Sequence, residues 1–241
     1  MCELFGLSCN EKDRAIRSSP VFVQRGSWCQ HGWGIGYYED SRAVVERSGE
    51  SISRPEAQER FFSIVERARS RTIIAHVRFA TSGTQDTCNS HPFKTRAFER
   101  DWIFAHNGGI ERFNYPTRED VGSEIDSARL FSYLIDQTER YVSQNRGIRG
   151  IYPGLKKALK TLLRDYPHSK INFLLSDGPC MYVFNHNHKP IYYLKRLKDY
   201  GGAILVTTIE DLSSEEWEAL PSDRLSVICN GEFLVLSSRL I

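Results

Sequence analysis

Cys2 is the residue whose type and place in this sequence point most directly to chemistry. A small second residue generally permits removal of Met1, which would leave a thiol and a free α-amine on one residue. The α-amine has an unperturbed pKa of about 7.7–8.0 and the thiol one of about 8.5, so the amine can accept the thiol proton near neutral pH. Cys2 is therefore a candidate N-terminal nucleophile that needs no separate histidine base. The alternative is a small apolar residue that begins a strand.

Two further segments carry groups that could bind and polarise a substrate. Residues 76–83 (HVRFATSG) place Arg78 at the end of an apolar run, where its guanidinium could bind a carboxylate in bidentate fashion. A surface arginine paired with a nearby acid is the alternative. Residues 104–109 (FAHNGG) offer the side-chain amide of Asn107 and the backbone N–H of Gly108, which together could form an oxyanion hole. Asn-Gly also favours a type I′ hairpin turn, which is the competing interpretation.

An acid and a histidine complete the candidate set. Asp126 could bind a substrate ammonium group, but Ser123 and Asp126 also fit a capping box at the start of a helix. A carboxylate that caps a helix is less available to a ligand. His91 lies in residues 89–93 (NSHPF), where a His-Pro pair in a loop is often only a turn.

Histidines elsewhere suggest two other kinds of site. A papain-like pair of Cys88 with His91 or His106 is one, although no local family motif surrounds these residues. A metal site at His186 and His188, with His168 upstream, is the other. Two histidines are too few for a catalytic zinc without a third ligand. We therefore expect surface histidines and no metal.

The composition excludes several classes of protein. The chain has 241 residues, of which 40% are hydrophobic, and 32 basic residues nearly balance 30 acidic ones. This gives no electrostatic reason to expect nucleic acid or an anionic membrane as a partner. The N-terminus lacks the pattern of a secretory signal, and no apolar run is long enough to span a bilayer. Six cysteines without a C-x-x-C pair indicate free thiols in the cytoplasm.

The elements that must position these residues are mostly strands. Helices are expected at residues 55–70, 123–142 and 155–166, and a hairpin pairs residues 33–38 with 42–47. The remaining strands are expected at residues 3–9, 72–79, 102–105, 171–175, 181–184, 191–194, 203–207, 225–229 and 233–236. Many strands with a few segregated helices predict an α+β fold, with two packed sheets and helices outside them, in one domain over residues 1–241.

Taken together, the motifs MCELFG, HGWGIGYY, HVRFATSG, NSHPF, FAHNG and IDS occur in a specific order. In this respect the chain resembles, over nearly its whole length, the class II glutamine amidotransferases of the N-terminal-nucleophile hydrolase superfamily. It is most similar to their stand-alone branch, which includes γ-glutamyl hydrolases of thiol metabolism. The resemblance implies a four-layer αββα sandwich. The chain departs from the family pattern at Ala128, at Ile209-Glu210-Asp211 and at His31, and these differences put the substrate in doubt.

The resemblance implies a role for each matching residue. Cys2 matches the nucleophile, and Asn107 and Gly108 match the oxyanion hole. The substrate-binding set comprises Arg78 for the α-carboxylate, with Thr81 beside it, Asp126 for the α-ammonium group, and His91.

The implied activity is hydrolysis of glutamine or another γ-glutamyl amide through a Cys2 thioester, without a cofactor. Ammonia transfer would need a separate acceptor protein, and assembly of several copies is left open. One alternative is a γ-glutamyl conjugate hydrolase with little glutaminase activity. Another is a non-catalytic module that senses glutamine.

Overall fold

The computed structural model describes residues 2–80, 83–144, 150–196, 202–210 and 212–240. In this part of the chain, thirteen strands form two sheets. The seven-stranded sheet has the order β11-β9-β10-β1-β4-β2-β3 and the six-stranded sheet the order β13-β12-β8-β7-β6-β5. All the pairings are antiparallel.

The strands of the first sheet are β1 (Glu3–Asp13), β2 (Trp33–Glu39), β3 (Arg42–Ser48), β4 (Ser70–Val77), β9 (Tyr192–Arg196), β10 (Ala203–Thr207) and β11 (Glu218–Ala219). Those of the second are β5 (Phe93–Ala97), β6 (Arg100–Gly109), β7 (Lys170–Ser176), β8 (Cys180–His186), β12 (Ser226–Cys229) and β13 (Glu232–Leu236). The helices are α1 (Ser19–Gly26), α2 (Pro55–Arg67), α3 (Asp126–Gln144) and α4 (Ile151–Asp165), with short 3₁₀ turns at Thr87–Asn89 and Glu119–Val121.

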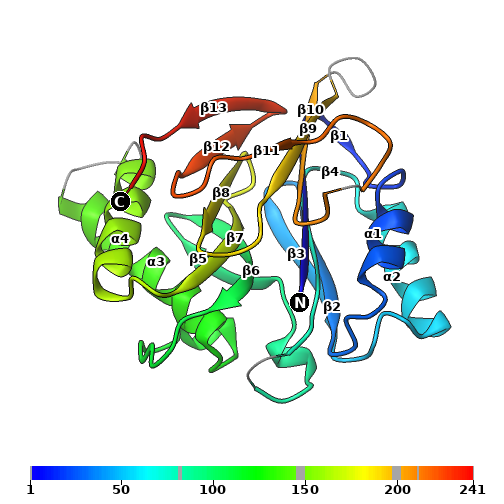
Figure 1. The fold of residues 1–241 in the computed structure, drawn as a ribbon, viewed down its shortest axis with the longest axis horizontal. Helices are drawn as coiled ribbons and strands as arrows, with labels where there is room; N and C mark the ends of the chain where they lie inside the picture. The colour runs from blue at the N-terminus through cyan, green and yellow to red at the C-terminus, as the bar shows by residue number, and fades with distance from the viewer. Residues whose placement is uncertain (1, 81–82, 145–149, 197–201, 211, 241) are drawn as a thin grey trace.

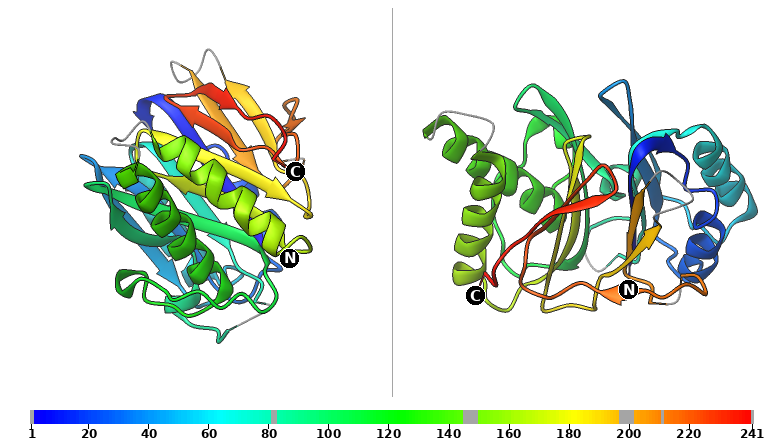
Figure 2. Two further views of the ribbon diagram at one scale, coloured as in Figure 1. Left: turned by 90° about the vertical axis from the view of Figure 1, so that its left-hand side faces the viewer. Right: turned by 90° about the horizontal axis from the view of Figure 1, so that it is seen from above.

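The two sheets pack face to face, and helices cover both outer faces (Figure 1). Figure 2 shows α1 and α2 against the first sheet and α3 and α4 against the second. Three apolar clusters fill the spaces between these layers. The middle cluster lies between the sheets and includes Leu4, Ile74, Ala105 and Leu174. This arrangement confirms the predicted α+β class and its four-layer order.

Local sequence explains several of these elements. The hairpin β2–β3 turns at Asp40 and Ser41, which both have positive φ, as a two-residue type I′ turn requires. Helix α2 has Pro55 in its first turn and buries Ala57, Phe61, Ile64 and Val65 on one face. It ends at Arg67, earlier than expected, because Ser70 already belongs to β4. Helix α1 and strand β5 were not predicted; each is short, at eight and five residues.

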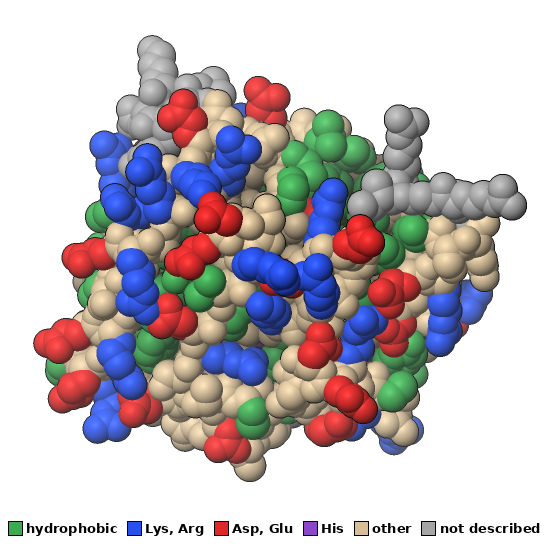
Figure 3. Space-filling model, turned by 180° about the vertical axis from the view of Figure 1, so that it is seen from behind, with side chains coloured by type: hydrophobic (Ala, Val, Ile, Leu, Met, Phe, Trp, Pro, Cys, Tyr) green, Lys and Arg blue, Asp and Glu red, His purple; other side chains and the backbone are tan. Residues whose placement is uncertain are grey.

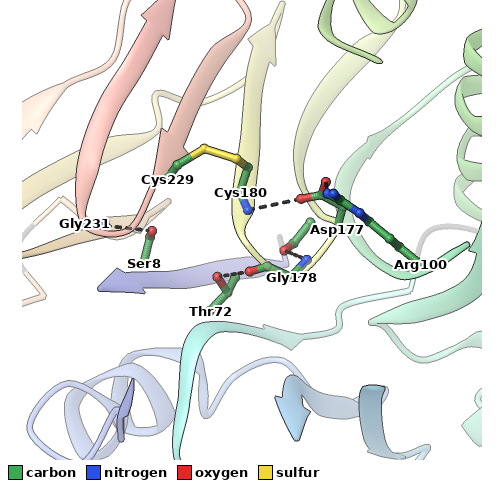
Figure 4. Close-up of a disulfide and its surroundings, with 9 residues drawn as sticks. Ser8, Thr72, Arg100, Asp177, Gly178, Cys180, Cys229 and Gly231 are labelled. Atoms are coloured by element: carbon green, nitrogen blue, oxygen red, sulfur yellow. Dashed lines mark hydrogen bonds and ion pairs between the residues drawn. A yellow bond between two sulfur atoms is a disulfide. The ribbon is translucent and has the colours of Figure 1, made fainter. Parts of the chain in front are cut away.

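The prediction that all six cysteines are free is wrong for one pair. Cys180 and Cys229 form a disulfide between β8 and β12 (Figure 4). The two residues are direct partners in the register of these strands, which brings their side chains together across 49 residues of sequence. Cys2, Cys9, Cys29 and Cys88 are free thiols.

The surface carries mixed charge. On the face opposite to the view of Figure 1, basic side chains are interspersed with acidic ones (Figure 3). None of the helices in the described ranges combines the length and the apolar character needed to cross a bilayer.

Candidate functional site

Cys2 lies immediately before β1, the central strand of the seven-stranded sheet. Glu3 pairs with Val77, so the chain before β1 runs beside the residues that follow β4. The backbone N–H of Phe79 donates to Cys2 Sγ at 3.1 Å, and the thiol donates to the Phe79 carbonyl at 3.3 Å. The Phe79 backbone therefore holds the sulfur in place.

Two opposing influences act on this thiol. Burial raises the pKa of Cys2, whereas the hydrogen bond from Phe79 and the charge of Arg78 lower it. Burial is the larger of these effects. A base close to the sulfur is therefore needed to generate the thiolate. Met1, which precedes Cys2, lies outside the described residues.

Asn107 faces Cys2 from the second sheet. Its Nδ2 donates to the Cys2 carbonyl at 2.6 Å, although 105 residues separate the two in sequence. The hairpin interpretation of Asn-Gly is wrong, because β6 continues through both residues. Asn107 pairs with Asn172, and Gly108 pairs with Ile171 on β7. The structure thus brings the predicted nucleophile and the predicted side-chain donor into direct contact.

Position 108 accommodates only glycine. Its φ is 146°, a region that L side chains rarely adopt. A Cβ at this position would lie 1.9 Å from the Lys170 carbonyl oxygen. Only glycine therefore allows β6 to approach β7 so closely beside Asn107.

His188 is a component of the site that sequence reasoning missed. Its Nε2 lies 3.0 Å from Asn107 Oδ1. The Cys2 carbonyl can only accept a hydrogen bond, so it is the amide nitrogen of Asn107 that faces Cys2, and Oδ1 faces His188. His188 Nε2 must then carry the proton and donate it. Burial, followed by the nearby charge of His106, lowers the pKa of His188 to about 4, so its imidazole is neutral near pH 7.

We expect His188 to remain the neutral Nε2–H tautomer at neutral pH and to become protonated only as the pH falls through about 4. The reason is that burial disfavours the charged imidazole while the Asn107 oxygen holds the Nε2 proton. Nitrogen-15 chemical shifts of the histidine rings, followed across a pH titration, measure both properties. A midpoint near the unperturbed value of about 6.5, or the Nδ1–H tautomer, would contradict this arrangement.

Arg78 lies just beyond β4 and is 3% exposed. Its Nη1 donates to the carbonyls of Thr84 at 3.0 Å and His31 at 3.3 Å. The His31 ring also accepts a hydrogen bond from the Ala80 N–H at 2.8 Å. His31, one of the departures from the family pattern, therefore helps to hold the segment that carries Arg78. Thr81 lies outside the described residues.

Asp126 is the first residue of α3, and its Oδ2 accepts from the Ile110 N–H at 3.2 Å. The capping-box interpretation is wrong, because α3 begins at Asp126 itself and its first turn closes on the Ile125 carbonyl. The Ser123 hydroxyl instead donates to Asn89 Oδ1 at 2.7 Å. Burial lowers the pKa of Arg78, and the negative charge of Asp126 is one of several smaller influences that oppose this shift.

Gly83 links the Arg78 segment to the start of α3. A Cβ there would lie 2.5 Å from Ile125 and 3.5 Å from Arg78 Nη2. The predicted carboxylate and ammonium binders therefore belong to adjoining parts of the site.

His91 is the remaining member of the predicted substrate-binding set, and its contact with substrate stays a prediction. It is only 3% exposed, and its ring packs against those of His76 and Phe93, with centroids at 4.4 and 4.6 Å. Burial, followed by the neighbouring His76, lowers its pKa well below the usual value. The His-Pro segment is thus part of the interior beneath the site.

Neither rival site is formed. Cys88 is exposed, and the nitrogens of His91 have no hydrogen-bond partner in the described structure. His106 Nδ1 pairs instead with Ser127 Oγ at 2.9 Å. The expectation of surface histidines is wrong for His186, which is buried against Asp223 Oδ1 at 2.7 Å. Within the described residues, no group of three potential ligands could hold a metal ion.

The chain is similar in sequence to known proteins. Residues 1–233 match the family model of the class II glutamine amidotransferases. The chain is 28% identical to YafJ of Escherichia coli, whose name assigns it to the glutamine amidotransferases, over 95% of this chain and 89% of that protein. It is 33% identical to the γ-glutamyl-hercynylcysteine sulfoxide hydrolase of Mycolicibacterium smegmatis, over 49% of this chain and 50% of that protein.

Among solved structures, the glutamine phosphoribosylpyrophosphate amidotransferase of Bacillus subtilis has the same fold. It superposes with a TM-score of 0.69 at 17% identity, and the match covers all of this chain and 49% of that one. The two antiparallel sheets between pairs of helices are therefore the sandwich of the N-terminal-nucleophile hydrolases.

Proposed function

Because the chain belongs to the class II glutamine amidotransferases, we propose that it hydrolyses γ-glutamyl amides through a thioester on Cys2. The observation that carries this proposal is the approach of Asn107 Nδ2 to within 2.6 Å of the Cys2 carbonyl, next to a sulfur held by the Phe79 backbone. Cys2 precedes a strand of the seven-stranded sheet, and Asn107 belongs to the six-stranded sheet.

The first step forms the thioester. The α-amine of Cys2, exposed by removal of Met1, takes the thiol proton, and the sulfur attacks the γ-carboxamide carbon. The C–S bond forms as the carbonyl electrons move to oxygen. That oxygen is stabilised by the second N–H of the Asn107 amide and by the backbone N–H of Gly108. The C–N bond then breaks, and the leaving amine takes the proton back from the α-ammonium group.

The second step releases the acid. Water attacks the thioester carbon, its proton passes to the Cys2 α-amine, and the same donors stabilise the new oxyanion. Collapse of this intermediate breaks the C–S bond and returns the proton to the sulfur. The products are glutamate and the free thiol, and no cofactor takes part.

Two substrate classes fit this mechanism and differ only in the leaving amine. With glutamine the product is ammonia, which a separate acceptor protein would consume. With a γ-glutamyl conjugate the product is a larger amine. The similarity to a γ-glutamyl hydrolase over about half of the chain favours including the second class.

The proposal is tested by measuring glutamate release from glutamine and from several γ-glutamyl amides. The protein used should be shown by intact mass to lack Met1. We expect glutamate from at least one substrate, and none from the same protein when Met1 is retained. If processed protein releases no glutamate from any of these amides, the proposal fails.

Replacing Arg78 with lysine is expected to raise KM for glutamine by about tenfold or more, because the ammonium of lysine keeps the charge but loses the bidentate fork. A substrate without the α-carboxylate should be affected much less. The measurement compares glutamine with a simple amide that lacks the α-groups, in Arg78→Lys and in Asp126→Asn. Equal losses on both substrates would show that these two residues only hold the loop and the helix start.

A further inference from the structure

Two exposed aromatic rings lie beside the nucleophile. Among the described residues, the large hydrophobic side chains on the surface are Ile16, Trp28, Phe79, Leu234 and Leu236. Trp28 is 43% exposed and Phe79 is 39% exposed, and their ring centroids are 5.7 Å apart at an interplanar angle of 43°. Exposed apolar side chains that contact one another are a common mark of a binding site.

One member of this pair, Phe79, contacts the reacting sulfur through its backbone. The backbone of Phe79 makes both hydrogen bonds to Cys2 Sγ. The Phe79 ring also packs on His31, with centroids 5.0 Å apart, and the His31 ring accepts from the Ala80 N–H. Both neighbours of the Phe79 ring, Trp28 and His31, therefore come from the segment that follows α1.

The two ends of a γ-glutamyl substrate would meet different surroundings. The groups proposed for the glutamyl end lie inward, since Arg78 and Asn107 are each 3% exposed. A substituent on the amide nitrogen would extend the other way, toward solvent. Phe79, whose backbone is hydrogen-bonded to the sulfur, and Trp28, whose ring contacts that of Phe79, provide exposed apolar surface there.

The charge near the pair narrows the choice of ligand. Arg78 precedes Phe79, and its positive charge acts on the Cys2 thiol that the Phe79 backbone holds. This cation disfavours a positively charged ligand on the adjoining rings, even though aromatic faces attract cations. A neutral aromatic ring, packed edge-to-face or offset on Trp28 and Phe79, satisfies both the apolar surface and the local charge.

We propose that Trp28 and Phe79 form the subsite for the leaving amine, and that the preferred substrates are γ-glutamyl amides whose amine carries a neutral aromatic group. This inference rests on the proposed hydrolase function and specifies its substrate class. Trp28 is then a specificity-determining residue that takes no part in the chemical steps.

The test compares γ-glutamyl-2-phenylethylamide with γ-glutamyl-propylamide, whose leaving groups are both alkylamines. We expect kcat/KM to be about tenfold higher for the phenylethylamide, the size expected of a good aromatic contact. Trp28→Ser should bring the ratio of the two values close to one, and Trp28→Phe should retain most of the preference. Leu234→Ser, which removes an exposed apolar side chain from β13, is the matched control and should keep the wild-type ratio.

The outcomes separate the two proposals. A wild-type ratio near one, a ratio unchanged in folded Trp28→Ser, or a preference for a γ-glutamyl-2-aminoethylamide bearing a positive charge would overturn the aromatic subsite while leaving the hydrolase function intact. Absence of glutamate release from both amides and from glutamine would instead overturn the hydrolase function itself. A thermal melt of each variant confirms that the folded protein is being compared.

Discussion

Replacing Cys2 with alanine is expected to abolish glutamate release, with a loss of kcat on the order of 10⁴–10⁶-fold, the scale seen when an enzyme loses its nucleophile. The sulfur is the only atom of this residue that can form the thioester, and alanine still permits removal of Met1. Cys2→Ser should lose nearly as much, because the hydroxyl is a far weaker nucleophile than a thiolate.

The same substitution should change stability little. Cys2 is half-buried, and its thiol makes two hydrogen bonds to the Phe79 backbone at the edge of the fold. Their loss is expected to cost about 1 kcal/mol in the free energy of unfolding. Cys88→Ala is the matched control, since that thiol is free and exposed, and it should retain wild-type turnover. Activity that survives in Cys2→Ala and disappears in Cys88→Ala would reverse the assignment.

Removing the Asn107 amide is expected to have the second-largest effect. Asn107→Ala should lower kcat by about 10²–10³-fold with little change in KM, as for other enzymes that lose one oxyanion donor. The donor is needed only when negative charge develops on the substrate oxygen, so binding of the ground state is largely unaffected. Steady-state kinetics on glutamine, or on the best γ-glutamyl amide, give both constants.

His188 provides a graded control for this interpretation. It orients the Asn107 amide through Oδ1 and does not face Cys2 itself. His188→Ala should therefore lower kcat less than Asn107→Ala, and His188→Gln, which can still donate a hydrogen bond, should recover part of the loss. If Asn107→Ala raises KM and leaves kcat unchanged, Asn107 binds the substrate and does not stabilise the oxyanion.

Much of this fold follows from local patterns in the sequence. Alternating or continuous apolar runs identified most strands, and the apolar stripes of residues 123–142 and 155–166 identified α3 and α4. A hairpin turning around Glu39, Asp40 and Ser41 was predicted from the two flanking runs, and β2 and β3 pair on either side of this turn. Helix α1 was missed because its eight residues barely exceed two turns and carry a weak apolar stripe.

Part of the site was predicted from the sequence, and what was missed depends on contacts between residues far apart in the chain. Cys2, Arg78, Asn107 and Asp126 carry distinctive chemistry in short motifs, and the fold brings them to adjoining positions. His188 has no motif of its own, and its contact with Asn107 spans 81 residues of sequence.

The same long-range dependence explains the other errors. The interior position of His186 and the pairing of Cys180 with Cys229 depend on how separate strands pack and align. Residue type and local spacing do not encode these relations. For Asn107 and Gly108 the local pattern favoured a turn, and their pairing with β7 overrode it.

The most direct test of the central claim is to find which thiol carries the γ-glutamyl group. The protein is incubated with an electrophilic glutamine analogue, such as a diazoketone, and the labelled peptides are identified by mass spectrometry. We expect one label, on Cys2 of a peptide that lacks Met1. Activity should be lost in step with labelling, and glutamine should protect the protein from both. A label on Cys88 or another thiol that tracks the loss of activity, or equal labelling of Cys2→Ala, would contradict the central claim.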